Sequence, residues 1–260
     1  MTIQTQKLYD GAAHGVQLAH RTTLDSSSAE ALELPGVIRY THDPRFGWRG
    51  FKYVRFDQSG GCTRGQLQSK RANIAITNIT AGTTTSVTLA GQTADIYVGG
   101  ILTCIDDAGG AGAAPEGESG IIVANTTSVI TIDENDAFSA APAANDDFVV
   151  ILPWAVVDSA DGDAAGIVQG VAMADHDQYD WGWIQFRGIN PDCDAIAAGT
   201  ALAVNESVVA DAAVVNDGAA DAVDLRIGRL LVQLSSDTVA RKAVVDLYCG
   251  EAFKMGLSAA

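Results

Sequence analysis

The residues of this chain best suited to binding chemistry alternate between basic and aromatic types in RFGWRGFKYVRF, residues 45–56. Rings that stack on bases and cations that hold phosphates form single-strand nucleic-acid platforms. On a β-strand, the same residues could instead bury their rings and turn their cations outward, or could face an acidic protein partner. We favour buried rings and outward cations over a nucleic-acid platform because the rest of the chain is acidic, and contact with an acidic partner stays open as a third reading. The candidate partner-binding residues are Arg45, Trp48, Arg49, Lys52 and Arg55.

A second aromatic group lies in YDWGWIQFRG, where Tyr179, Trp181 and Trp183 occupy alternate positions. Alternate residues of a strand point to the same face. Three rings on one face could bind a sugar or a partner protein. A sheet core or a subunit contact would explain them equally well, and both readings stay open.

Catalytic and metal-binding signatures are missing from the sequence. The four histidines, His14, His20, His42 and His176, have no HxH or HExxH spacing, and neither a GxSxG elbow nor a phosphate-binding or dinucleotide-binding glycine loop occurs. The four cysteines form no CxxC pair, so we expect free, buried thiols. We therefore predict no enzymatic activity, no cofactor and no metal centre.

Two acidic clusters invite a calcium hypothesis. They lie beside turns, in DSADGD (Asp158, Asp161, Asp163) and in DENDAF (Asp133, Glu134, Asp136). Neither matches the twelve-residue calcium loop with its terminal Glu. We favour solvated turn acids, and calcium binding at these turns stays undecided.

Charge is distributed unevenly along the 260 residues, whose net charge is −16. Residues 1–75 carry ten Lys or Arg against six Asp or Glu, whereas Ala72 to Phe186 carries sixteen acids and no Lys or Arg. Such an acidic region repels phosphate and anionic lipid, so we expect neither nucleic-acid nor membrane binding. No apolar run is long enough to cross a bilayer, and MTIQTQKLYDG lacks the apolar run of a signal peptide, so we expect a soluble protein.

Short runs rich in Thr, Val and Ile, separated by Gly, Asn and Asp, predict an all-β protein. We expect an extended N-terminal arm at 1–35, a β-sandwich or barrel-like main domain made of 36–75 and 158–260, and an inserted acidic β module at 76–157. Two β domains in tandem are the alternative. Gly50, where the parity of the aromatic residues changes, predicts a β-bulge.

A family resemblance enters through the C-terminal hundred residues. The order GIVQGVAMADHDQYDWGWIQFRG, GTALAV, RIGRLLVQL and KAVVDLYCG resembles accessory head proteins of tailed bacteriophages, the decoration or cement proteins. The residues that carry this resemblance are Gly170, Val171, Ala172, Tyr179, Gly182, Trp183, Gln185, Gly188, Ile227 and Gly228. The Thr-rich block beginning TTTSVTLAGQTADIYVGG is similar to β modules of phage virion proteins.

The resemblance implies a structural virion protein on the outer surface of the capsid, made in the host cytoplasm. Its partners would be the major capsid protein and further copies of itself, as a trimer or dimer. The chain is large for a cement protein, so a major capsid, tail or fibre subunit stays possible, as does a carbohydrate-binding β module using Tyr179, Trp181 and Trp183. We expect the basic segment, residues 1–75, to face the lattice and the acidic region to point away.

Overall fold

The computed structural model confirms the all-β class. It describes residues 9–10, 24–25, 27–77, 79–106, 114–158, 164–195, 207–211, 214–217, 226–231 and 241–249. Within these ranges the regular structure consists of strands and one 3₁₀ turn, η1 (Glu134–Asp136), with no α-helix. Of the predicted arm at 1–35, residues 9–10, 24–25 and 27–35 are described.

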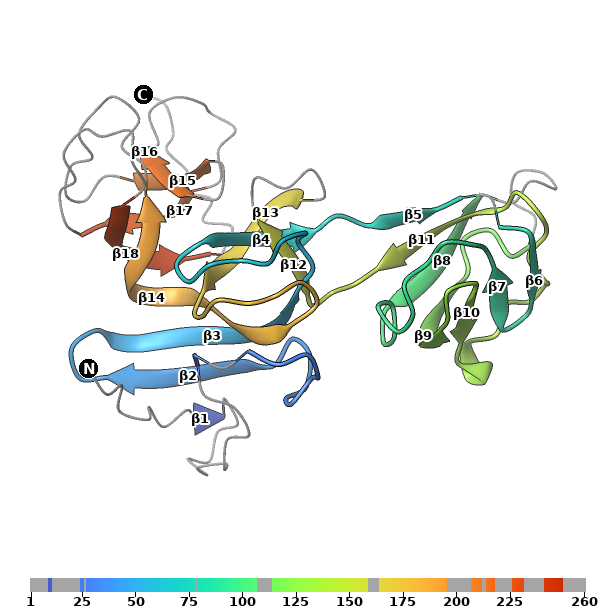
Figure 1. Ribbon diagram of the computed structural model, residues 1–260, viewed down its shortest axis with the longest axis horizontal. Coiled ribbons are helices and arrows are strands. Elements are labelled where there is room, and N and C mark those ends of the chain that lie inside the picture. Colours follow the sequence, from blue (N-terminus) through green and yellow to red (C-terminus); the bar gives the residue numbers. More distant parts are fainter. Residues whose placement is uncertain are drawn as a thin grey trace, which may run out of the picture. The chain divides into compact units, whose positions relative to one another are not determined.

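The chain divides into two units (Figure 1). Unit 1 comprises Met1–Arg71 and Trp154–Ala260, and unit 2 comprises Ala72–Pro153. The chain of unit 1 thus continues on both sides of unit 2. Each boundary of unit 2 lies four residues earlier than the sequence predicted.

Unit 1 contains an 11-stranded sheet in the order β1-β2-β3-β12-β4-β13-β14-β16-β15-β17-β18. Its strands are β1 (Tyr9–Asp10), β2 (Ile38–Asp43), β3 (Gly47–Phe56), β4 (Leu67–Arg71), β12 (Ala155–Asp158), β13 (Ala164–Ala172), β14 (Trp181–Ala195), β15 (Ser207–Asp211), β16 (Val214–Asp217), β17 (Arg226–Leu230) and β18 (Arg241–Tyr248).

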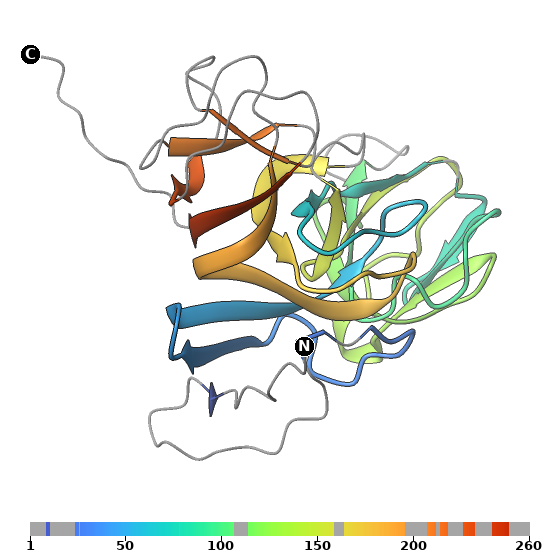
Figure 2. The ribbon, with the colours of Figure 1, turned by 60° about the vertical axis from the view of Figure 1, so that its left-hand side comes forward.

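The strand pairings of unit 1 close into rings. β3 pairs with β12, β12 with β4, β4 with β13, β13 with β14, and β14 returns to β3. A second ring runs through β16, β15, β17 and β18 and closes on the same β14. The 15-residue β14 therefore belongs to both rings, and it bends along its length (Figures 1 and 2). Ring closure removes exposed strand edges, as in a barrel.

Strand β3 is buried on both faces. Phe51 and Tyr53 pack in one core cluster that includes Trp183. Val54 and Phe56 pack in another. Because successive side chains point to opposite faces, this strand separates two apolar layers rather than covering one.

The bulge predicted at Gly50 lies on the neighbouring strand instead. β2 and β3 pair without interruption from Ile38↔Lys52 to Asp43↔Gly47. The register shifts on β14, around Phe186, opposite Gly50. A Cβ atom at Gly50 would lie 2.9 Å from Cζ of Phe186. Glycine at position 50 therefore leaves room for the ring at the bulge of β14, and a larger residue would require this ring to shift.

Unit 2 contains a seven-stranded sheet in the order β5-β11-β8-β9-β10-β7-β6. Its strands are β5 (Ile74–Ile76), β6 (Ala81–Thr83), β7 (Ser86–Thr88), β8 (Ile101–Asp106), β9 (Ser119–Asn125), β10 (Val129–Ile132) and β11 (Asp147–Ile151). The first strand pairs with the last, β5 with β11. In unit 1 the flanking strands β4 and β12 also pair with each other. The chain thus leaves and re-enters each unit through adjacent strands.

The core of unit 2 is mainly aliphatic. Strand β9 alternates strictly at its start, with Gly120 and Ile122 buried and Ile121 and Val123 exposed. The largest side chains with no exposure in this unit include Leu102, Ile122, Ile130 and Phe148. Burial of these side chains supplies the main driving force for folding of unit 2.

Candidate partner-binding surfaces

Arg49, one of the predicted partner-binding cations, lies inside unit 1. Its Nε and Nη2 atoms donate to Oε1 of Gln185 at 3.1 and 2.5 Å. Its Nη1 lies 3.9 Å from Oδ2 of Asp43. Burial lowers the pKa of Arg49, and the carboxylate of Asp43 opposes that shift. The expectation that this cation points outward is wrong, since its partners are supplied within the chain.

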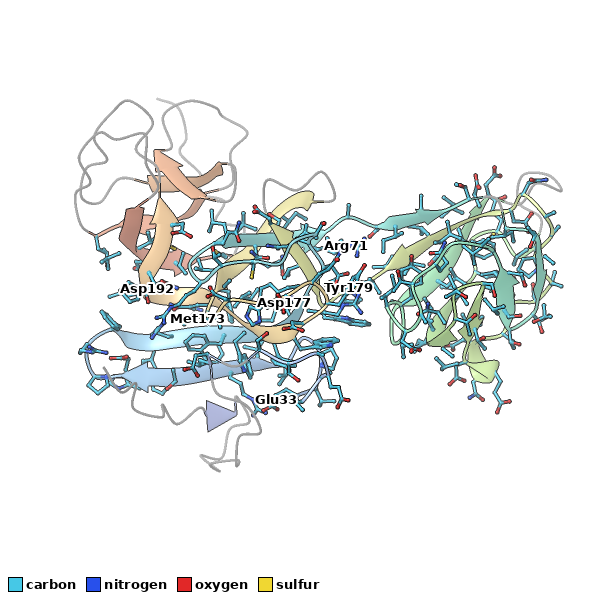
Figure 3. The ribbon with its side chains drawn as sticks, viewed as in Figure 1. Glu33, Arg71, Met173, Asp177, Tyr179 and Asp192 are labelled. Atoms are coloured by element: carbon cyan, nitrogen blue, oxygen red, sulfur yellow. The ribbon has the colours of Figure 1, made fainter. Side chains whose placement is uncertain are left out.

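Arg55 is also buried, in an ion-pair network centred on Asp57. Its Nε and Nη2 donate to the two oxygens of Asp57 at 2.6 and 2.9 Å, and Nη1 of Arg71 donates to Oδ2 of the same carboxylate at 2.5 Å. The side chain of Asp57 has no exposed surface. Arg71, labelled in Figure 3, is the last residue before unit 2. This network therefore ties β3 to β4 at the point where the chain leaves unit 1, and Arg55 is not available to a partner.

The predicted aromatic group is mostly part of a core. Tyr179 precedes β14 and has a φ of 70°, so the expected three-residue alternation along a strand holds only for Trp181 and Trp183. Trp183 is completely buried and Trp181 is half-buried. Trp183 therefore cannot serve as a partner-binding or sugar-binding surface in this fold.

Aromatic stacking accounts for these residues. The ring centroids of Tyr53 and Trp181 are 5.8 Å apart, those of Tyr53 and Trp183 are 5.1 Å apart, and Trp154 stacks on Trp181 at 6.4 Å. The guanidinium of Arg55 lies 5.7 Å from the ring of Tyr179 (labelled in Figure 3) and 5.9 Å from that of Trp181. Four of the predicted residues thus lie in one packed cluster: Arg55, Tyr179, Trp181 and Trp183. The rings of this cluster hold the Arg55 side chain in place.

The remaining three predicted residues are accessible to different degrees. Trp48 is 63% exposed at the β2–β3 hairpin, where its ring packs edge-on to His42. The side chain of Arg45 is 69% exposed. Lys52 is half-buried and donates from Nζ to Gln169 at 3.0 Å. Burial lowers the pKa of Lys52, and the charge of Lys70 lowers it further.

His176 belongs to a hydrogen-bonded group with Ser27 and Asp180 that no sequence motif predicted. Its Nδ1 lies 3.0 Å from Oγ of Ser27, whose hydroxyl donates to the carboxylate of Asp180. The imidazole stacks on Phe56 at 3.9 Å, and a Cβ atom at Gly182 would lie 2.0 Å from its Cε1. His176 is therefore buried, with Phe56 on one face of its ring and the backbone of Gly182 close to Cε1. Burial lowers the pKa of His176 to about 4.

All four cysteines are buried thiols outside any disulfide, as predicted. Burial raises the pKa of both Cys62 and Cys249 to about 12. Because the thiolate is the nucleophilic form, these two thiols are unreactive in the folded chain.

The acidic turns cap the backbone where they are described. Oδ1 of Asp133 accepts from the backbone N–H of Asn135 at 2.8 Å, and Oδ2 of Asp136 accepts from that of Ile121 at 3.1 Å. Asp161 and Asp163 lie outside the described residues. Among those described, no group of three or more His, Cys, Asp or Glu is arranged to hold a metal ion.

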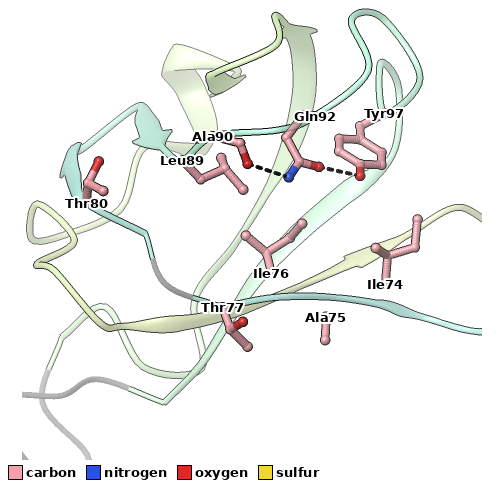
Figure 4. Close-up of a pocket in the computed structure, with 9 residues that line it drawn as sticks. All are labelled: Ile74, Ala75, Ile76, Thr77, Thr80, Leu89, Ala90, Gln92 and Tyr97. Atoms are coloured by element: carbon pink, nitrogen blue, oxygen red, sulfur yellow. Dashed lines mark hydrogen bonds between the residues drawn. The ribbon is translucent and has the colours of Figure 1, made fainter.

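A hollow of about 370 Å³ lies in unit 2, between β5 and the segment from Leu89 to Tyr97 (Figure 4). Its polar groups bond to one another. The hydroxyl of Tyr97 donates to Oε1 of Gln92 at 2.6 Å, and Nε2 of Gln92 lies 3.4 Å from the carbonyl of Ala90. The hollow is therefore lined by a mixture of polar and aliphatic groups, and the amide of Gln92 is bonded to two of its neighbours.

The outer face of β11, β8 and β9 carries aliphatic side chains, and we call it the aliphatic face. Residues paired across strands share a face. Ile101 pairs with Ile121 on one side and with Ile151 on the other, and Thr103 pairs in the same way with Ser119 and Val149. The aliphatic members of this face are Ile101, Ile105, Ile121, Val123, Val149 and Ile151.

Exposure distinguishes the aliphatic face from an ordinary sheet surface. Ile105 is 53% exposed, Ile121 51% and Val123 46%. The hydroxyls of Thr103 and Ser119 bond to each other at 2.8 Å. Sequence reasoning did not single out these residues, although the alternation in ILTCID and SGIIVAN was visible. Alternation alone does not show which side of each strand is exposed.

Comparison with protein-family models, with curated proteins and with solved structures gives no match for this chain. In the described part of the chain, no helix is long and apolar enough to cross a membrane.

Proposed function

We propose that the protein is a structural virion protein that binds the outside of a tailed-phage capsid as a decoration or cement protein. The sequence resemblance described above suggests this class. The observation that carries the proposal is the aliphatic face, which suits a flat protein contact better than a small ligand. In this proposal the major capsid protein is the partner, and the protein is made in the host cytoplasm before it joins the particle.

The charged groups of unit 1 are consistent with this proposal. Arg49 and Arg55 are held by Gln185, Asp43 and Asp57, and His176 is enclosed. Groups used in this way stabilise a scaffold rather than turn over a substrate. Self-association as a trimer or dimer on the lattice belongs to the same proposal.

The carbohydrate-binding alternative loses support from burial. It required three rings on one accessible face, but Trp183 is fully buried and Tyr179 lies outside the strand. A glycan array with the wild type and a Trp181→Ala variant should therefore show no ring-dependent binding.

The decisive experiment measures binding of the full chain to phage capsids stripped of it, together with the copy number per native particle. We expect saturable binding and hundreds of copies. Six or twelve copies would instead indicate a tail or portal component. Complete absence of the protein from purified particles would contradict the proposal.

A further inference from the structure

We infer that the aliphatic face of unit 2 is a docking surface for a different protein, whose contact surface has an apolar centre and a Lys or Arg at one edge. This inference deepens the proposed function and rests on it for the identity of the partner. It also reverses the sequence-based expectation that the basic segment makes the contact while the acidic region points away.

The apolar centre follows from the geometry of the face. Three adjacent strands present aliphatic side chains at paired positions, and the hydroxyls between them, on Thr103 and Ser119, satisfy each other. Figure 1 shows β11, β8 and β9 side by side in unit 2. The six aliphatic members and the two hydroxyl residues between them carry no charge, and Asp147 begins β11 on the same side. Contiguous aliphatic surface of this kind favours removal from water by a complementary apolar surface.

The charged edge lies at one end of the same strands. Asp106 ends β8, Asp147 begins β11, and the two residues occupy directly opposed positions. Glu118 lies at this end too, immediately before β9. Like charges on opposed residues of neighbouring strands are destabilising. A Lys or Arg of the partner would relieve that repulsion while the aliphatic surfaces meet.

Ionisation at this edge is supported locally. The side-chain hydroxyl and the backbone N–H of Ser139 both donate to the carboxylate of Glu118, the latter at 2.7 Å. These hydrogen bonds lower the pKa of Glu118. The carboxylate therefore remains charged at neutral pH, at the same end of the strands as Asp106 and Asp147.

Charge also argues against a second copy docking through this face. Residues 72–153 contain ten Asp or Glu and no Lys, Arg or His. Two such faces brought together would oppose acid with acid, which selects against the pair. The complementary occupant is consequently a cation-bearing protein surface and not the same face of a second copy.

The closing experiment uses the full chain and two immobilised peptide probes, one of alternating Leu and Lys and one of alternating Leu and Glu. The test variant is Ile121→Thr with Val123→Thr, which removes aliphatic surface but keeps strand-forming residues. The matched control is Ile38→Thr with Ile167→Thr, two unit 1 residues that are each 45% exposed. Circular dichroism and thermal unfolding verify that all variants fold.

We expect the wild type to prefer the Leu–Lys probe, the test variant to bind it about tenfold more weakly, and the control to match the wild type. A variant with Asp106→Asn and Asp147→Asn should associate more slowly and show less dependence on salt. Equal binding of the two probes, or unchanged binding by the test variant, would overturn the inference.

Two further outcomes separate the inference from the proposed function. If the peptide results hold but stripped capsids do not bind the wild type, the proposed function fails and the docking surface stands. If sedimentation shows self-association that the test variant abolishes, a second copy occupies the face and the inferred partner is wrong.

Discussion

Units 1 and 2 handle their acidic residues in opposite ways. In unit 1, Asp57 and Asp43 are buried beside arginines, and aromatic rings pack around the guanidinium of Arg55. Unit 2 contains no basic residue at all, so its acids cannot be neutralised internally. Instead they accept backbone hydrogen bonds at turns, as Asp133 and Asp136 do, around an apolar core.

This difference shows which side chains of each unit have a complementary partner within that unit. The cations of β3 that seemed ready for a partner are already used by the fold of unit 1. The acids of unit 2 meet no Lys or Arg within their own unit, and Ile105, Ile121 and Val123 are exposed there. The contrast therefore assigns scaffolding to the buried network of unit 1 and recognition to unit 2.

The largest predicted effect comes from breaking the network of unit 1. Replacing Asp57 by Asn leaves Arg55 and Arg71 without their shared carboxylate in a buried site. We expect the free energy of unfolding to fall by about 3–5 kcal/mol, as for other buried pairs that lose one partner. Urea denaturation measures it, with Asp106→Asn as the exposed control. A loss similar to that of the control would contradict the described network.

A smaller loss is expected from Gly50→Ala. The new methyl group would contact the ring of Phe186, only 2.9 Å from its Cζ, and should cost about 1–3 kcal/mol. The same substitution in a Phe186→Ala background should cost less, because the obstructing ring is gone. Equal costs in both backgrounds, measured by thermal or urea unfolding, would argue against the bulge opposite Gly50.

Burial of His176 in unit 1 should make the free energy of unfolding depend on pH. Its folded-state pKa of about 4 lies below the 6.5 of an ordinary histidine, so the unfolded chain binds the proton first. Stability is therefore retained above pH 6.5 and is lost as pH falls toward 4. Between pH 7 and 5 we expect the wild type to lose about 2 kcal/mol more than His176→Gln. If the free energy of unfolding changed with pH in parallel for the two proteins, the burial of the neutral imidazole would be contradicted.

The smallest effect is expected from Arg45→Ala. Arg45 lies 3.8 Å from the carboxylate of Asp43, but its side chain is mostly exposed. Exposed ion pairs contribute only about 0–1 kcal/mol, so unfolding should change by less than about 1 kcal/mol. A loss as large as that of Asp57→Asn would remove the distinction between the buried cations of β3 and the exposed Arg45.

The sequence predicted the all-β class because strand-length runs and turn residues are local signals. The bulge was assigned to the wrong strand because the glycine marks where a neighbouring ring needs space, and Phe186 lies far away in the sequence. The burial of Arg49 and Arg55 could not be predicted either. Arg49 is buried because Gln185 of the neighbouring strand bonds to it, and Arg55 is buried because Asp57 bonds to it along the chain. Only the folded strand pairing establishes these contacts.

Residues of the aliphatic face were partly predictable. Alternation in SGIIVAN already placed Ile121 and Val123 on one side of a strand. Which side is buried depends on the pairing of β9 with β8 and β10, and that pairing connects segments separated by a loop. The sequence therefore identified the two sides of the strand without showing which one was exposed.

Side-chain footprinting by carbene labelling tests the central claim most directly. The full chain is labelled free and bound to stripped capsids, and the labelled residues are mapped. The account predicts that Ile105, Ile121 and Val123 lose labelling on binding, while Trp48 at the β2–β3 hairpin keeps it. Protection of Trp48 and Arg45 with undiminished labelling of the three aliphatic residues would contradict the assignment of recognition to unit 2.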